Sequence, residues 1–164
     1  MKGERGGFRM LRREQLLQEL VHDSYKADEK LPEPTRCPKC GALFHKGRWT
    51  WDLAPPNAHE HVCPACHRIH DQFPAGYVTL KGVFLASHHD EIVHLVKHCE
   101  TKEKAEHPLE RVMAIKDTEH GIEVTTTGAH LAREIAERVQ HAYKGELKFS
   151  YNKEDNLLRA AWNR

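Results

Sequence analysis

Hydrophobic residues follow two distinct patterns in the second half of this chain. Five stretches alternate apolar and polar residues as strands do: 77–85, 111–116, 121–126, 146–151 and 157–162. Two further stretches place apolar residues at helical spacing: Ile92, Leu95, Val96 and Cys99 in the first, and Leu131, Ile135 and Val139 in the second. The order of the seven elements predicts an α+β fold for residues 76–164. This is a ferredoxin-like βαββαβ domain with one extra terminal strand, in which a single antiparallel sheet carries both helices on one face.

Residues at the ends of the helical stretches indicate where each helix begins and ends. Ser87 and Asp90 have the spacing of a capping box for the first helix, and Thr127 is placed to cap the second. Gly145 is expected to end that second helix. Cys99 lies on the apolar stripe of the first helix, which predicts a packed thiol and not a ligand or nucleophile.

The first 34 residues differ in character and are predicted to form a basic flexible arm with one short helix. Residues 1–13 contain five Lys or Arg side chains against the single Glu4, a net charge of +4, whereas the whole chain carries +1. Apolar residues at helical spacing predict the helix between residues 12 and 22, and Pro32 and Pro34 indicate a linker. Such basic segments often contact nucleic acid, and a solvated tail is the alternative. The arm residues assigned to RNA contact are Arg5, Arg9, Arg12 and Arg13.

Two Cys-x-x-Cys pairs lie between the arm and the α+β domain. Cys37, Cys40, Cys63 and Cys66 have the pattern of a zinc ribbon over residues 35–75, because a two-residue spacer lets one tight turn direct both sulfurs at one Zn²⁺ ion. Four protein ligands leave no open coordination position, so the ion is expected to be structural. Free thiols or disulfides are the alternative, as is replacement of one sulfur by His67 or His70.

The segment between the cysteine pairs is predicted to be an elongated hairpin finger with a basic tip. Cations that bind phosphate and aromatic rings that stack on bases are the two components of sequence-tolerant RNA binding. The tryptophans have an alternative role, because a small ribbon needs a few large side chains for its own core. The finger residues assigned to RNA contact are Lys46, Arg48, Trp49 and Trp51.

Composition and motifs narrow the class of protein. The chain has 164 residues, 39% of them apolar, and contains neither a run long enough to cross a membrane nor the apolar centre of a signal peptide, so a cytoplasmic location is expected. An enzyme is not expected, and neither is a small-molecule substrate. The zinc deaminase signature is missing, since Arg36 and Val62 precede the two cysteine pairs, and no phosphate-binding glycine loop occurs.

Several stretches resemble one known family. Residues 63–69 and 75–82 resemble the zinc ribbon and following strand of the large-ribosomal-subunit export adaptor, the nonsense-mediated decay protein three of eukaryotes and archaea. Residues 121–126, 132–136 and 145–147 are similar to a later strand and helix of the same family. The whole chain resembles a set of short bacterial proteins that share the stretches 47–51 and 106–111.

The resemblance implies a protein that docks on the large ribosomal subunit through shape and backbone contacts, without catalysis. Further cysteine pairs, later β domains and the transport signal of the export adaptors are missing from this sequence, so export does not carry over. The sequence therefore predicts a non-enzymatic protein with one structural Zn²⁺ that docks on ribosomal RNA, in maturation, quality control or a stress response. A protein-interaction adaptor, whose ribbon grips another polypeptide, is the alternative.

Overall fold

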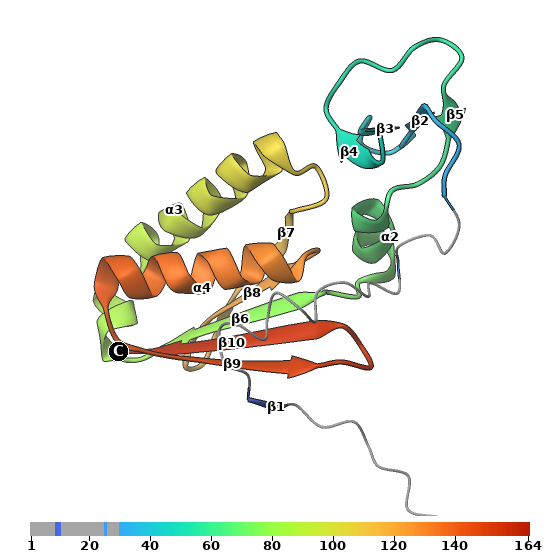
Figure 1. The fold of residues 1–164 in the computed structure, drawn as a ribbon. Helices are drawn as coiled ribbons and strands as arrows, with labels where there is room; N and C mark the ends of the chain where they lie inside the picture. Colours follow the sequence, from blue (N-terminus) through green and yellow to red (C-terminus); the bar gives the residue numbers. More distant parts are fainter. Residues whose placement is uncertain (1–8, 11–24, 26–29) are drawn as a thin grey trace, which may run out of the picture.

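The computed structural model describes residues 9–10, 25 and 30–164, and for Arg9 and Met10 only the backbone is described. The predicted helix at residues 12–22 and the side chains of Arg5, Arg12 and Arg13 therefore lie outside the described residues. The described part is an α+β structure with two sheets and three helices (Figure 1). We call residues 30–73 the cysteine region and residues 74–164 the sheet region.

The elements of the sheet region follow the predicted order, strand, helix, two strands, helix, two strands. They are β6 (Gly76–Lys81), α3 (Val83–Glu106), β7 (Val112–Thr118), β8 (Gly121–Thr126), α4 (Ala129–Tyr143), β9 (Glu146–Asn152) and β10 (Leu157–Asn163). The two-residue strand β1 (Arg9–Met10) adds to the edge of this sheet beside β9. Both helices cover the same face of the sheet (Figure 1).

The sheet is mixed and not fully antiparallel, which corrects the prediction. Its order is β1-β9-β10-β6-β8-β7, and the last strand, β10, pairs parallel to β6, with Ala160 opposite Val78. In the predicted ferredoxin-like arrangement the strand after α4 would itself lie beside β6. Here β9 lies further out and β10 returns between β9 and β6. The alternation along β10 explains this, because Leu158, Ala160 and Trp162 are all buried, and a central position covers such a face most completely.

The core lies between the sheet and the two helices. The predicted helix residues Ile92, Val96, Leu131, Ile135 and Val139 are all fully buried, and they pack against the apolar face of β6, β8 and β10. Leu95 is partly buried against the same core, and Cys99 is 4% exposed, as expected of a packed thiol. The helical and strand periodicities therefore identified the core faces correctly.

The helix starts differ from the sequence prediction. β6 ends at Lys81 and α3 begins at Val83, because Gly82 adopts a φ of +114° that turns the chain, and the backbone then breaks from helical geometry at His88. Ser87 donates to the carbonyl of Phe84 and is not a cap. At the second helix Thr127 donates to the carbonyl of Leu109. A carboxylate oxygen of Glu110 accepts the Leu131 N–H and so takes the capping role.

The cysteine region has a small sheet and one helix. Its elements are β2 (Thr35–Arg36), β3 (Leu43–His45), β4 (Arg48–Thr50), β5 (His59–Glu60) and α2 (Pro64–Asp71), with sheet order β4-β3-β2-β5. The hairpin β3–β4 is shorter than the elongated finger that was predicted, and residues 51–58 form a loop. The helix α2, which begins directly after Cys63, was not predicted either.

No helix of the part that the structure describes is long and apolar enough to cross a membrane.

Candidate metal centre

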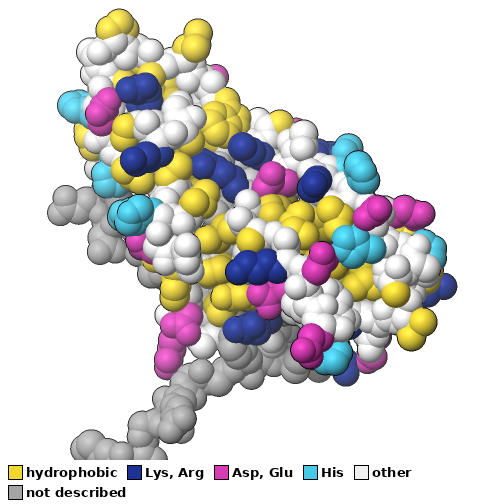
Figure 2. Space-filling view, turned by 180° about the vertical axis from the view of Figure 1, so that it is seen from behind, with side chains coloured by type: hydrophobic (Ala, Val, Ile, Leu, Met, Phe, Trp, Pro, Cys, Tyr) yellow, Lys and Arg dark blue, Asp and Glu magenta, His cyan; other side chains and the backbone are white. Residues whose placement is uncertain are grey.

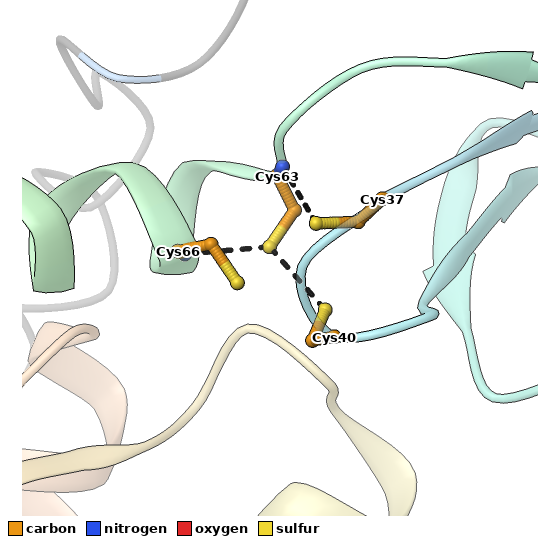
Figure 3. A group of neighbouring side chains, drawn as sticks. All are labelled: Cys37, Cys40, Cys63 and Cys66. Atoms are coloured by element: carbon orange, nitrogen blue, oxygen red, sulfur yellow. Dashed lines mark hydrogen bonds between the residues drawn. The ribbon is translucent and has the colours of Figure 1, made fainter.

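Four cysteine sulfurs converge at the junction of the two regions (Figure 3). Cys37 and Cys40 come from the turn between β2 and β3, and Cys63 and Cys66 from the start of α2. The Sγ atoms all lie within 4.8 Å of one another. Cys37 and Cys63 are completely buried, whereas Cys40 and Cys66 are half-buried. The two pairs predicted from the sequence therefore do meet in one cluster.

Local backbone geometry directs each pair of sulfurs inward. In the first pair the Gly41 N–H donates to the Cys37 carbonyl at 2.9 Å, and Gly41 has a φ of +81°, a value that glycine adopts without strain. In the second pair Cys63 is the N-cap of α2, with Pro64 at the first helical position. The Cys66 N–H donates to the Cys63 sulfur at 3.4 Å.

The spacing of the sulfurs fits a tetrahedral metal ion. Four sulfurs bound at about 2.3 Å from a central Zn²⁺ lie about 3.8 Å from one another. The Sγ atoms of Cys40 and Cys63 are 3.8 Å apart, a separation that fits a shared ion and excludes a disulfide bond between them. None of the five cysteines forms a disulfide bond. The four cysteines can therefore hold one metal ion, with every ligand supplied by the protein.

The histidine alternative has no support in this geometry. The metal-binding group found among the described residues contains the four cysteines and no histidine. His67 and His70 are exposed on α2, where the His67 ring contacts Tyr25 and the His70 ring contacts the carboxylate of Asp71.

The thiols differ in acidity because their surroundings differ. Burial would by itself raise the pKa of Cys37, but the N–H groups of Cys63, Cys40 and Lys39 donate toward its sulfur, and the pKa falls to about 7. Burial raises the pKa of Cys63. Burial also raises the pKa of Cys66, although the hydrogen bond from Arg111 opposes that rise. A cation at the centre would favour the thiolate form of all four.

Arg111 is a residue of the site that the sequence analysis missed. Its guanidinium donates from Nη1 to the Cys66 sulfur at 3.2 Å and from Nη2 to the Cys63 sulfur at 3.6 Å. The residue is only 8% exposed, and it comes from the loop before β7, which runs beneath the sulfurs in Figure 3. Arg111 lies 45 positions after Cys66, so no local spacing connects it with the cysteines. It is the last residue of the stretch 106–111 that the resemblance singled out.

Two further contacts join the cysteine region to the sheet region beside the metal centre. Leu109 packs against the small core formed around Cys37, Ala42, Cys63 and Ala65. The indole Nε1 of Trp51 donates to the carbonyl of Lys104 near the end of α3, at 2.6 Å. Trp51 is 39% exposed, and the indole edge that carries Nε1 contacts the protein itself.

The remaining finger residues divide into a packed tryptophan and an exposed tip. Trp49 is half-buried and packs on the core around the cysteines, and its ring centroid lies 5.4 Å from that of Phe44. Of the two roles that the sequence left open for Trp49, RNA contact or ribbon core, this packing favours the core. Lys46 and Arg48 are exposed. Lys46 and Gly47 both have positive φ, 53° and 77°, as a two-residue type I′ turn requires, so this turn projects from the end of the hairpin.

Comparison with models of protein families, with curated protein sequences and with solved structures finds no match for this chain. The resemblance to the export adaptor family therefore stays a prediction from its motifs.

Proposed function

We propose that this chain is a non-enzymatic zinc protein that docks on RNA, and that the large ribosomal subunit is its target. The observation that carries the metal part of the proposal is the convergence of four cysteine sulfurs at tetrahedral spacing. Zinc is the ion of choice because it prefers tetrahedral thiolate sites and has no redox chemistry of its own. Four protein ligands leave no position for a substrate or a reactive water, which supports a structural ion.

The hairpin tip supports the RNA part of the proposal. Lys46 and Arg48 are exposed on either side of Gly47, and His45 beside them is exposed as well. No carboxylate of the described residues pairs with the Lys46 or Arg48 side chain, although Glu33 accepts the N–H of Gly47 at the same tip. Exposed cations on a rigid turn can bind phosphate oxygens without ordering a long loop.

The contact is expected to be local, because the charges elsewhere are mixed. On the face shown in Figure 2, basic and acidic side chains are interspersed and no large area of one sign stands out. Binding through phosphate contacts would then depend on the tip together with the arm cations, Arg5, Arg9, Arg12 and Arg13. The choice of the ribosome as the target rests on the resemblance described above.

Salt-dependent RNA binding tests the role of the tip. Affinity of the purified, zinc-loaded protein for a single-stranded RNA is measured by fluorescence anisotropy over a range of salt concentrations. The double variant Lys46→Glu and Arg48→Glu should bind more weakly, and the slope of log affinity against log salt should flatten by about 1.4 if both side chains contact phosphates.

A double reversal elsewhere on the protein is the matched control. Lys97→Glu with Lys102→Glu changes the net charge equally on the exposed side of α3 and should leave the slope near that of the unchanged protein. An equal loss in both double variants would show that only net charge matters. Binding of the unchanged protein that is undetectable at low salt would end the RNA proposal.

A protein-interaction adaptor is the second candidate, and one observation favours it. Leu53 in the loop after β4 is 96% exposed, and the neighbouring Pro55 and Pro56 are exposed too. A bare leucine on a proline-stiffened loop suits contact with another polypeptide better than contact with phosphate. Sedimentation of the tagged protein through a sucrose gradient, with and without RNase, separates the two candidates. Co-migration with ribosomes that persists at high salt and after RNase, and is lost in Leu53→Asp, would favour the adaptor.

A further inference from the structure

We propose that metal binding and the docking of the cysteine region on the sheet region are one coupled equilibrium, and that Arg111 is the residue that couples them. The ion would then do more than fold a small ribbon, because its presence would decide whether the two halves of the molecule hold each other. The inference rests on the metal part of the proposed function and is independent of RNA binding.

The geometry of Arg111 is the first step. Its guanidinium reaches two of the four sulfurs, Cys66 at 3.2 Å and Cys63 at 3.6 Å, while Nε donates to the carbonyl of Pro108 at 2.9 Å. The side chain is thus held at both ends of its guanidinium group, by the cysteine region and by its own loop. Among the described residues no carboxylate forms an ion pair with it.

Charge compensation is the second step. A guanidinium that is 8% exposed requires an anionic partner, because an unpaired buried charge is strongly unfavourable. One Zn²⁺ with four thiolates has a net charge of about −2 and supplies that partner. The metal holds the four thiolates together against their mutual repulsion, so the full compensating charge exists at this place only while the ion is bound. Removing the ion therefore weakens the interaction that keeps Arg111 buried against the cysteine region.

The loop that carries Arg111 is the third step, because it transmits this contact to the sheet region. The Arg111 N–H donates to the hydroxyl of Thr127 at 2.9 Å, and the Thr127 N–H donates back to the Arg111 carbonyl at 2.9 Å. Glu110 accepts the Leu131 N–H in the first turn of α4, and Leu109 packs on the core around the cysteines. A single short loop thus touches the metal ligands on one side and the start of α4 on the other.

Coupling of this kind is reciprocal, which makes it measurable from both sides. If the metal stabilises the docked arrangement, then the docked arrangement must raise the affinity for the metal by the same factor. Zinc removal should loosen the segment 104–111, and loss of the Arg111 guanidinium should weaken zinc binding. A metal ion that only folds its own ribbon would produce neither effect in the sheet region.

Hydrogen exchange of the unchanged full-length protein is the first measurement. Backbone exchange of the segment 104–111 is compared between zinc-loaded and chelator-stripped protein by mass spectrometry. We expect exchange there to accelerate at least about tenfold on stripping, while β6 and β8 in the centre of the sheet change little. This comparison needs no variant, so it decides the proposal even if a variant folds poorly.

Zinc affinity of Arg111 variants is the second measurement, made by competition with a chromophoric chelator. Arg111→Met keeps the length of the side chain without its charge and should lower the affinity about 10- to 100-fold. Arg111→Lys keeps the charge without the two-pronged donor and should lie between Arg111→Met and the unchanged protein. Arg138→Met is the matched control, because Arg138 pairs with Glu134 on α4 and, unlike Arg111, donates to none of the four described sulfurs of the metal centre.

The outcomes separate the coupling from the proposed function. Zinc binding with unchanged exchange at residues 104–111 on stripping would overturn the coupling alone, and so would an affinity of Arg111→Met equal to that of Arg138→Met. An unchanged protein that binds no zinc would overturn the metal part of the proposed function as well. The expected result is that zinc loading slows exchange at residues 104–111 in the unchanged protein. Arg111→Met should lose this slowing and bind zinc more weakly, and Arg111→Lys should recover part of both effects.

Discussion

At the scale of single residues, the sulfur atoms of the metal centre differ in how firmly the protein keeps their protons. Backbone N–H donors around the Cys37 sulfur lower the pKa of that thiol, whereas burial raises the pKa of Cys63 and Cys66. The sequence revealed these four residues because each pair acts through one local turn, whose spacing can be read directly. It could not reveal Arg111, because a long-range contact between a cation and two sulfurs leaves no periodicity in the chain.

Zinc affinity is expected to rise steeply with pH. Burial raises the pKa of Cys63 and Cys66, so in the metal-free protein at neutral pH both thiols keep protons that the ion must displace. At least two displaced protons make the apparent affinity rise at least about a hundredfold per pH unit, and protonation of Cys37 adds to this in acid. Chelator competition between about pH 6 and 8, with the chelator calibrated at each pH, measures the slope. An affinity independent of pH would contradict the buried thiol environment.

Glu110 gives a second prediction at the residue scale. Burial raises the pKa of its carboxyl group above the ordinary value of 4.5, so folding favours the protonated form. The stability of the sheet region should therefore fall as pH rises from 4.5 through the raised value of the folded state. Glu110→Gln keeps an acceptor for the Leu131 N–H without the charge, and should reduce this pH dependence and leave the protein at least as stable at neutral pH.

Urea unfolding at several pH values measures the effect. Glu119→Gln changes an exposed carboxylate in the β7–β8 turn and should leave the pH dependence as it is. Glu110→Ala removes the acceptor altogether and should cost about 1 kcal/mol in the free energy of unfolding. A larger loss in Glu110→Gln than in Glu110→Ala would contradict this account.

At the scale of elements, helical and strand periodicity located every major segment of the sheet region, because each places apolar residues at regular spacing against the core. The starts of the two helices were predicted less accurately. Ser87 and Thr127 have cap chemistry but bond to carbonyl groups of Phe84 and Leu109, while Glu110, distant in sequence, supplies the acceptor for α4. The helix α2 escaped prediction because it is short and its apolar residues are few, since its first turn is built around metal ligands.

The packing of α4 on the sheet leads to a quantitative prediction. Ile135 is completely buried against both α3 and the sheet, so Ile135→Ala should cost about 2 to 5 kcal/mol in the free energy of unfolding. Val83 is also an apolar helix residue but is 89% exposed, and Val83→Ala should change stability by less than about 0.5 kcal/mol. Denaturant unfolding followed by circular dichroism measures both. Equal effects of the two substitutions would contradict the packing described here.

At the scale of the whole molecule, the sheet region has a complete core of its own, while the cysteine region has a very small one centred on the metal ligands. The sequence indicated this division through its change of pattern near Pro74. It did not indicate how the two regions join, because the junction consists of single contacts from Trp51, Leu109 and Arg111. It also missed the parallel pairing of β10 with β6, since strand periodicity does not specify neighbours.

The unequal cores predict an unequal response to loss of a ligand. Cys63→Ser should abolish zinc binding and unfold the cysteine region, while the sheet region keeps its own cooperative melting transition. Elemental analysis gives the zinc content and circular dichroism the melting curve. Cys99→Ser is the contrasting variant, because this thiol is buried in the sheet region, and it should keep one zinc ion per chain while lowering the melting temperature. Zinc content retained in Cys63→Ser would rule out the proposed ligand set.

The central place of β10 also bears on how the chain folds as it is being made. β10 pairs with β6 about 80 positions earlier, and it separates β9 from the rest of the sheet. During synthesis β6, β7, β8 and both helices emerge first, yet the strand that closes their core is still inside the ribosome tunnel. The nascent chain must therefore keep an open apolar groove beside β6 until β10 emerges, and during this interval a chaperone or an incorrectly paired strand is best able to compete for that groove.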